Sequence, residues 1–242
     1  MKTLIKTNFN KAAHKYNEHS QIQKKSSEFL FKIAKKHIDE KNINSILDIG
    51  SGTGQTSLTF MKYYKDKNYT LCDISENMIK ESRKSIQNAN YIVCDAESYE
   101  FKNQYDLAIS NLTMQWIGNL ENFLAKMLNH SNVFCFSTLV NTSFSEYKSI
   151  FTNRSLPPPT FKYYDTKTLK KIVEKIGNVI SFHIKSYKES FDNILSAAKH
   201  FKNIGASTSS TSGLNYVPIL FSHRSPLILN YDIAFIVIKR KH

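Results

Sequence analysis

Cysteine is scarce in this chain of 242 residues, which has only Cys72, Cys94 and Cys135. Each of them lies in or beside an apolar run, and no two form a C-x-x-C pair or join histidines at zinc-ligand spacing. We therefore expect buried thiols in a reducing compartment, and no metal site.

Long apolar runs are missing as well. No stretch is long enough to span a bilayer, and the first residues lack the apolar core of a signal peptide. Hydrophobic residues nevertheless make up 41% of the chain, which is typical of a globular protein with a real core. These features predict a single domain over residues 1–242 that is cytoplasmic and makes no membrane contact.

Arginine is rare among the basic residues: Lys and Arg total 33, but Arg occurs only at 83, 154, 224 and 240. The formal net charge is +13. A basic surface could recruit an acidic partner, or the lysines could reflect general compositional drift, and both interpretations stay open. The lysines are scattered without a dense basic block, so we expect no stable nucleic-acid binding.

Glycine is also infrequent, yet three of the 7 glycines fall in residues 50–54. Residues 46–54 read Ile-Leu-Asp-Ile-Gly-Ser-Gly-Thr-Gly, an apolar run that contains Asp48 and ends in a glycine-rich turn. A helical pattern follows over 55–64, and a second apolar run ends in Asp73. Strand, glycine turn, helix and a later acidic residue are typical of the first unit of a nucleotide-binding α/β sheet.

Strands and helices alternate along the rest of the chain. We expect strands at 45–49, 70–73, 91–94, 107–111, 133–139, 179–186 and 231–239, and helices at 8–40, 55–64, 76–87, 120–128, 166–176 and 191–201. This order predicts an α/β fold with a mostly parallel seven-stranded sheet and helices on both faces. Residues 1–44 should form a helical lid, 45–140 the ligand-binding core, and 141–242 a substrate-side half.

Two segments of residues 141–242 are predicted to lie outside the regular strand–helix alternation. Residues 141–165 contain Pro157-Pro158-Pro159 and should form a loop. About forty residues separate the last two strands, which is too many for a tight hairpin. We therefore expect an insertion over about 190–226 that covers the active-site edge.

The glycine turn also discriminates between ligands. A dinucleotide site has the pattern G-x-G-x-x-G/A, whereas here Asp48 precedes Gly50-Ser51-Gly52-Thr53-Gly54. A carboxylate beside the turn disfavours a diphosphate and suits the cationic amino and sulfonium groups of S-adenosylmethionine. The segment resembles the first motif of class I methyltransferases, which have a Rossmann-like fold.

Later segments narrow the resemblance. Residues 73–78 and 94–97 look like the second and third motifs of that superfamily. Phe9-Asn10-Lys11-Ala12-Ala13-His14-Lys15-Tyr16 with Gln23, then residues 109–116, 136–139, 201–206 and 225–231, are similar to the malonyl-[acyl-carrier protein] O-methyltransferases of biotin synthesis. The chain departs from that family at Asn129-His130-Ser131-Asn132, where a Lys-Pro-Gly-Gly-like turn is usual, and its alignment around Arg154 is poor.

The resemblance implies a set of cofactor-binding residues. Asp73 would accept hydrogen bonds from the ribose hydroxyls, Ile74 and Met78 would pack against the adenine, and Asp95 would take the adenine amino group. The full set comprises Gln23, Asp48, Gly50, Ser51, Gly52, Gly54, Asp73, Ile74, Met78, Asp95, Ala96, Glu97, Asn111, Leu112 and Trp116. The cofactor would be S-adenosylmethionine, with S-adenosylhomocysteine as product.

The implied reaction is methyl transfer to the free carboxylate of a malonyl thioester on acyl carrier protein or coenzyme A. That carboxylate is ionised at neutral pH, so no general base is required. Tyr16 and Arg154 are the candidate catalytic residues: Tyr16 would close over the reacting groups and Arg154 would hold the carboxylate, with Lys199 and Lys202 as alternatives. Another small carboxylic acid, an RNA substrate, or a non-enzymatic binding module are the competing hypotheses.

Overall fold

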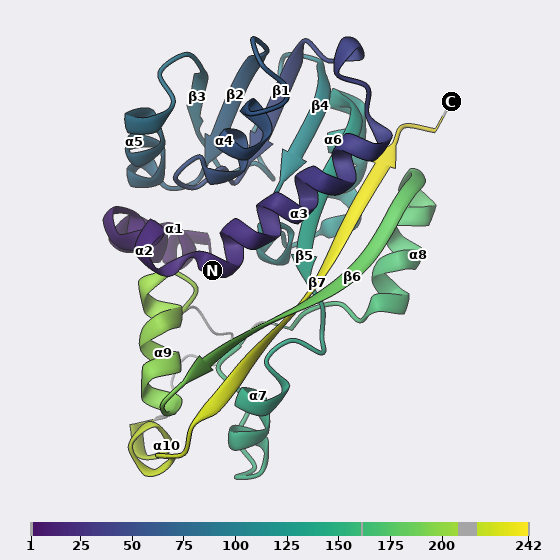
Figure 1. Cartoon of the computed structure of the whole chain (residues 1–242). Helices are drawn as coiled ribbons and strands as arrows, with labels where there is room; N and C mark the ends of the chain where they lie inside the picture. The colour runs from purple at the N-terminus through teal and green to yellow at the C-terminus, as the bar shows by residue number, and fades with distance from the viewer. Residues whose placement is uncertain (1, 161, 208–216, 242) are drawn as a thin grey trace.

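Seven strands form one twisted sheet in the order β3-β2-β1-β4-β5-β7-β6 (Figure 1). The structure, a computed structural model, describes residues 2–160, 162–207 and 217–241. The strands are β1 (Ser45–Ile49), β2 (Asn68–Asp73), β3 (Asn90–Val93), β4 (Tyr105–Ser110), β5 (Ser131–Leu139), β6 (Asn178–Phe191) and β7 (Leu227–Lys239). Strands β1 to β5 are parallel, and β7 runs antiparallel between β5 and β6. The predicted mostly parallel sheet is confirmed, and each predicted strand overlaps an observed one.

Helices cover both faces of this sheet, which is why its strands are continuous apolar runs. One core cluster joins the strands to α3 (Gln21–His37), α4 (Gln55–Met61), α7 (Ser145–Thr152) and α9 (Ile194–Asn203). The other joins them to α6 (Leu120–His130) and α8 (Thr166–Ile176). Helix α5 spans Glu76–Ser85, and helix α10 spans Val217–Ser222. Among the described residues, no helix combines the length and the apolar character that crossing a membrane requires.

The N-terminal segment divides into α1 (Lys2–Ala12), a 3-10 turn (Ala13–Lys15), α2 (Tyr16–His19) and α3. Figure 1 shows α1 and α2 beyond the carboxyl ends of β1, β2 and β4, between these strands and α9. Ligands of open parallel sheets bind at that edge, so the N-terminal helices border the expected site.

The expectation of a loop over 141–165 is wrong in its first half, because α7 lies there. Tyr147, Ile150 and Phe151 recur at helical spacing and are buried against the sheet. Burial of this apolar face stabilises the helix, whereas Pro157-Pro158-Pro159 disfavour helix only in the residues that follow it.

The two final strands pair along almost their whole length, from Asn178 opposite Lys239 to Phe191 opposite Leu227. As expected, no tight hairpin joins them: α9 and α10 lie in the connection. Residues 208–216, which belong to the predicted insertion over about 190–226, lie outside the described part of the chain.

Candidate functional site

The glycine-rich turn after β1 is built by left-handed backbone. Gly50, Gly52 and Gly54 have φ values of +64°, +55° and +86°. A Cβ on Gly50 would lie 2.3 Å from Thr113 Oγ1, so no side chain fits there. A Cβ on Gly52 would meet nothing within 4 Å, because this part of the turn faces open space. The turn therefore packs against its neighbours on one side and leaves its backbone accessible on the other.

That open side borders a first cavity of about 90 Å³ beyond the ends of β1, β2 and β4. It brings together most of the predicted cofactor-binding residues, and α1 closes it with Lys2, Ile5 and Phe9. The predicted residues that line it are Gly50, Gly52, Asp73, Ile74, Met78, Asp95, Ala96, Asn111, Leu112 and Trp116. Half-buried Cys94 and buried Cys72 also line it.

Asp73 fixes the turn to the start of α5. Its Oδ2 accepts a hydrogen bond from Gly52 N at 2.9 Å, and its Oδ1 accepts one from Ser75 N at 2.8 Å. Burial raises the pKa of the Asp73 carboxyl to about 6, although the backbone hydrogen bonds lower it. Its remaining lone pairs face the cavity, which fits the ribose role.

Asp48 lies under the turn and does not line the cavity. Ser57 Oγ donates to Asp48 Oδ2 at 2.6 Å, but Asp48 Oδ1 has no hydrogen-bond partner. The buried Ser51 Oγ in the turn and Gln23 Oε1 on α3 also have none. Unsatisfied acceptors beside an acidic group fit a ligand that carries a cationic donor, such as the ammonium group of S-adenosylmethionine.

Glu97 serves a structural role. Its Oε1 accepts hydrogen bonds from Gly118 N at 2.9 Å and Asn119 N at 3.1 Å, and its Oε2 pairs with Lys2 Nζ. The same ammonium lies 3.4 Å from Asp95 Oδ1. Lys2 thus lies beside the carboxylate that was predicted to take the adenine amino group.

The N-terminal segment is attached to both rims of the first cavity. Asn10 Oδ1 accepts hydrogen bonds from Ser75 Oγ at 2.6 Å and Asn77 N at 3.1 Å on one rim. Asn17 Oδ1 accepts one from Thr53 Oγ1 at 2.6 Å on the other. Sequence reasoning missed these contacts, because Asn and Ser side chains give no periodic signal.

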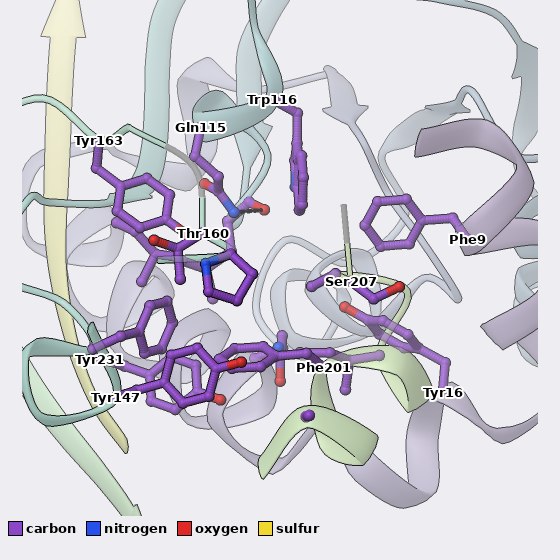
Figure 2. A pocket seen from close by; sticks show the side chains of 18 of the residues that line it. Phe9, Tyr16, Gln115, Trp116, Tyr147, Thr160, Tyr163, Phe201, Ser207 and Tyr231 are labelled. Carbon is purple, nitrogen blue, oxygen red and sulfur yellow. Dashed lines mark hydrogen bonds between the residues drawn. The ribbon is translucent and has the colours of Figure 1, made fainter. Parts of the chain in front are cut away.

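A second cavity of about 200 Å³ adjoins the first. Phe9, Tyr16, Leu112 and Trp116 line both, so these four side chains form the junction. Figure 2 shows Trp116 and Phe9 on one side of this cavity and the rings of Tyr147, Tyr163 and Tyr231 on the other. We call it the acyl cavity.

Aromatic and neutral polar side chains dominate the acyl cavity. Among its described lining residues none is charged; its polar groups include Gln23, Gln115 and Thr160. Sequence reasoning missed Phe144, Tyr147 and Tyr163, although the density of aromatic residues over 144–164 could have indicated a pocket wall.

The predicted carboxylate ligand, Arg154, is not brought to this cavity. Its side chain is exposed at the end of α7, where Nη1 donates to Ile150 O at 2.8 Å. Lys199 and Lys202 are exposed on α9 and do not line the cavity either. Because α7 is short and its last turn uses the guanidinium as a cap, this geometry gives no support to Arg154 as a substrate ligand.

Asn111 lines the first cavity, but its amide is already used. Its Oδ1 accepts hydrogen bonds from Ser26 Oγ at 2.6 Å and Ser137 Oγ at 2.7 Å, and its Nδ2 donates to Gln23 O at 3.0 Å. The amide therefore ties α3 to the ends of β4 and β5. It also supports Leu112, whose φ of 52° turns it into the junction between the cavities.

The sequence segments that carry the narrower resemblance meet at the acyl cavity. They contribute Phe9, Tyr16 and Gln23 from the first, Leu112, Gln115 and Trp116 from the second, Leu139 from the third, Phe201, Ile204 and Ala206 from the fourth, and Tyr231 from the last. Gly205, at φ +71°, permits the contact between two of them, because a Cβ there would lie 2.7 Å from Phe9 Cδ1.

A family model described as a methyltransferase domain matches residues 46–132, which hold the glycine turn, Asp73 and Asp95. Residues 46–132 thus hold a class I S-adenosylmethionine-dependent methyltransferase domain. Solved structures agree on the methyltransferase fold. A putative methyltransferase from Bacillus halodurans superposes with a TM-score of 0.61 at 12% identity, over 90% of this chain and 100% of that one. A methyltransferase from Thermotoga maritima superposes with a TM-score of 0.58 at 13% identity, over 98% of this chain and 100% of that one.

Curated relatives extend the similarity of this methyltransferase beyond its core. It is 28% identical to the malonyl-[acyl-carrier protein] O-methyltransferase of Bacillus cereus, over 91% of this chain and 86% of the relative. It is 25% identical to the enzyme of the same name from Neorickettsia risticii, over 99% of this chain and 97% of the relative. Ilyobacter polytropus has two enzymes of that name, and the second is 29% identical to this chain over 86% of this chain and 82% of the relative. The alignment with the Neorickettsia risticii enzyme, over 99% of this chain, includes the segments around the acyl cavity.

Proposed function

We propose that this methyltransferase transfers a methyl group from S-adenosylmethionine to the free carboxylate of a malonyl thioester carried by acyl carrier protein. The observation that carries the proposal is the origin of the acyl cavity. Five separate segments that resemble the malonyl-[acyl-carrier protein] enzymes converge on it, and it joins the first cavity at Phe9, Tyr16, Leu112 and Trp116.

The first cavity suits the cofactor, which supplies an electrophilic methyl group when bound. Asp73 would hold the ribose and Asp95 the adenine amino group, while Asp48, with its unpaired Oδ1, would face the ammonium group. Lys2 would release Asp95 and keep its pairing with Glu97. These roles rest on the motif resemblance and on the free acceptors around the turn.

The acyl cavity suits a nucleophile that is already ionised. The malonyl carboxylate needs desolvation, alignment with the methyl group and protection from water. Aromatic walls exclude water, and Gln115 and Tyr16 can donate hydrogen bonds near the junction. Burial raises the pKa of Tyr16 above its ordinary value, so its hydroxyl keeps its proton. Neutral donors leave the carboxylate more reactive than a tight ion pair would.

Two segments are proposed as covers of the site. Residues 1–44 bridge both rims of the first cavity through Asn10 and Asn17, and the insertion over about 190–226 supplies α9 to the acyl cavity. Opening of these segments would admit cofactor and substrate, and closure would exclude water.

The charge distribution supports an acidic partner. Residues 45–140 have 8 Lys and Arg against 10 Asp and Glu, a net charge of −2. Residues 1–44 have 10 against 4, and residues 141–242 have 15 against 6, which gives +6 and +9. Uniform compositional drift would also have enriched the core in lysine. The excess instead lies in the substrate-side segments, where it would attract an acidic carrier protein.

The experiment that tests this function follows label from S-adenosylmethionine into malonyl-carrier protein, with acetyl-carrier protein and bulk tRNA as alternative acceptors. We expect label only in the malonyl carrier, as a base-labile methyl ester. Labelling of tRNA alone, or equal labelling of the acetyl carrier, would overturn the proposal.

A further inference from the structure

A polar cluster, buried except for part of Glu189, lies behind the wall of the acyl cavity opposite Trp116 and Phe9. It consists of Glu189 on β6, His200 on α9 and Tyr231 on β7. His200 Nε2 is 3.0 Å from Tyr231 Oη and 3.4 Å from Glu189 Oε2. His200 is 7% exposed and Tyr231 only 2%. The cluster takes no part in the reaction described above, yet Tyr231 lines the acyl cavity.

The imidazole of this cluster is neutral. Its ring lies 5.1 Å from that of Phe191 and 6.1 Å from that of Phe201, and burial among these side chains lowers the pKa of His200 to about 4. His19, which faces it from α2, lowers the pKa further. A neutral imidazole has a single N–H, so His200 offers the cluster at most one proton.

The Glu189 carboxylate supplies most of the hydrogen-bond acceptors in this cluster. The Tyr231 hydroxyl is close enough to Glu189 to lower the pKa of that carboxyl, and of the two groups only the hydroxyl has a proton to donate when the carboxyl is ionised. Glu189 Oε2 is nevertheless buried without a hydrogen-bond partner. Burial raises the pKa of Glu189, while Lys25 on α3 and the Tyr231 hydrogen bond lower it. The cluster thus has more acceptors than donors and a negative charge behind the wall.

The hydrogen-bonding capacity of the Tyr231 hydroxyl is therefore restricted. This hydroxyl lies 3.0 Å from His200 Nε2 and close to Glu189, so its only proton is engaged by groups that do not line the cavity. A hydroxyl in this state can accept a hydrogen bond from a ligand but cannot donate one. Figure 2 shows Tyr231 across the cavity from Trp116 and Phe9, which border the cofactor side.

We propose that Tyr231, held by Glu189 and His200, is a specificity-determining residue that keeps the substrate's carboxylate off its own wall of the cavity and directs it toward the cofactor. The proposal rests on the proposed function. A malonyl thioester has a carboxylate at one end and a carrier arm with amide N–H groups at the other. Only one orientation brings the carboxylate to the junction. An acceptor backed by negative charge repels the carboxylate and accepts an N–H, so it favours that orientation.

The decisive variant is Glu189→Gln, which removes the charge and keeps the shape. A neutral wall tolerates the reversed, unproductive orientation. Unproductive binding lowers kcat and KM by the same factor, so we expect each to fall by about fivefold while kcat/KM is unchanged. Glu28→Gln is the matched control, because Glu28 is exposed on α3 beside the same strand and does not line the cavity. It should leave both constants as they are.

A second measurement needs no turnover. Malonyl-pantetheine binding is measured with the protein loaded with S-adenosylhomocysteine, and Glu189→Gln and Tyr231→Phe should bind it more tightly than the parent. A fall in kcat/KM, or unchanged binding in both variants, would overturn the orientation role, as would a parent protein that binds no malonyl-pantetheine. Binding with the expected changes but without methyl transfer would refute only the proposed function.

Discussion

Asp48 is a fully buried carboxylic acid, and no cationic side chain in the described part of the chain forms an ion pair with it. Its pKa is raised to about 7, mainly by burial and to a lesser extent by Asp73, although the Ser57 hydrogen bonds lower it. Because this pKa is higher in the folded chain than in the unfolded chain, the cofactor-free protein loses stability at this group as pH rises from about 4 to about 7. A bound ammonium group would reverse the preference by favouring the ionised form.

Cofactor affinity should consequently depend on pH. We expect the Kd for S-adenosylmethionine to rise by up to about tenfold per unit as pH falls below about 7. Asp48→Asn should weaken binding at pH 8 and flatten the dependence between pH 6 and 7, whereas Asp73 still contributes below about 6. Calorimetric titrations across this range measure both effects, with exposed Asp192→Asn as control. Parallel pH profiles for the parent and Asp48→Asn would refute the role of Asp48.

At the scale of the elements, the junction between α9 and α1 depends on one glycine. Gly205 ends α9 with φ +71°, and a Cβ there would lie 3.1 Å from Phe9 Cα as well as against its ring. Gly205→Ala should cost about 1–2 kcal/mol from backbone conformation alone. It should also move α9 away from Phe9 and raise KM for the acyl substrate. Chemical denaturation and steady-state kinetics test this, and Asn203→Ala on the same helix should change neither by a comparable amount.

The same elements mark what the sequence could and could not predict. The strands and the helices α4, α5, α6, α8 and α9 follow from apolar periodicity, and the first cavity from motifs that are local in sequence. The helix α7 was missed because burial of Tyr147 and Phe151 depends on β7, which is about eighty residues away. Arg154 was proposed on chemistry alone, since nothing in the sequence states where a guanidinium points. The cluster of Glu189, His200 and Tyr231 joins three elements and has no local signal.

At the scale of the whole molecule, charge is divided between two regions. Residues 45–140, which would bind the cofactor, have a net charge of −2, whereas the flanking segments together have +15. Long-range attraction of this kind accelerates encounter with an acidic macromolecule and is screened by salt. It has little effect on a small substrate that diffuses into the cavity by itself.

Two acceptors separate steering from the chemistry of the site. For malonyl-carrier protein, kcat/KM should fall by about tenfold between low and high salt, whereas for malonyl-pantetheine it should change little. The double variant Lys199→Glu with Lys202→Glu reverses charge on α9 and should weaken the salt dependence for the carrier protein. Lys65→Glu with Lys67→Glu makes the same change in total charge within 45–140 and should preserve it. Equal effects of the two double variants would mean that net charge acts without a preferred face.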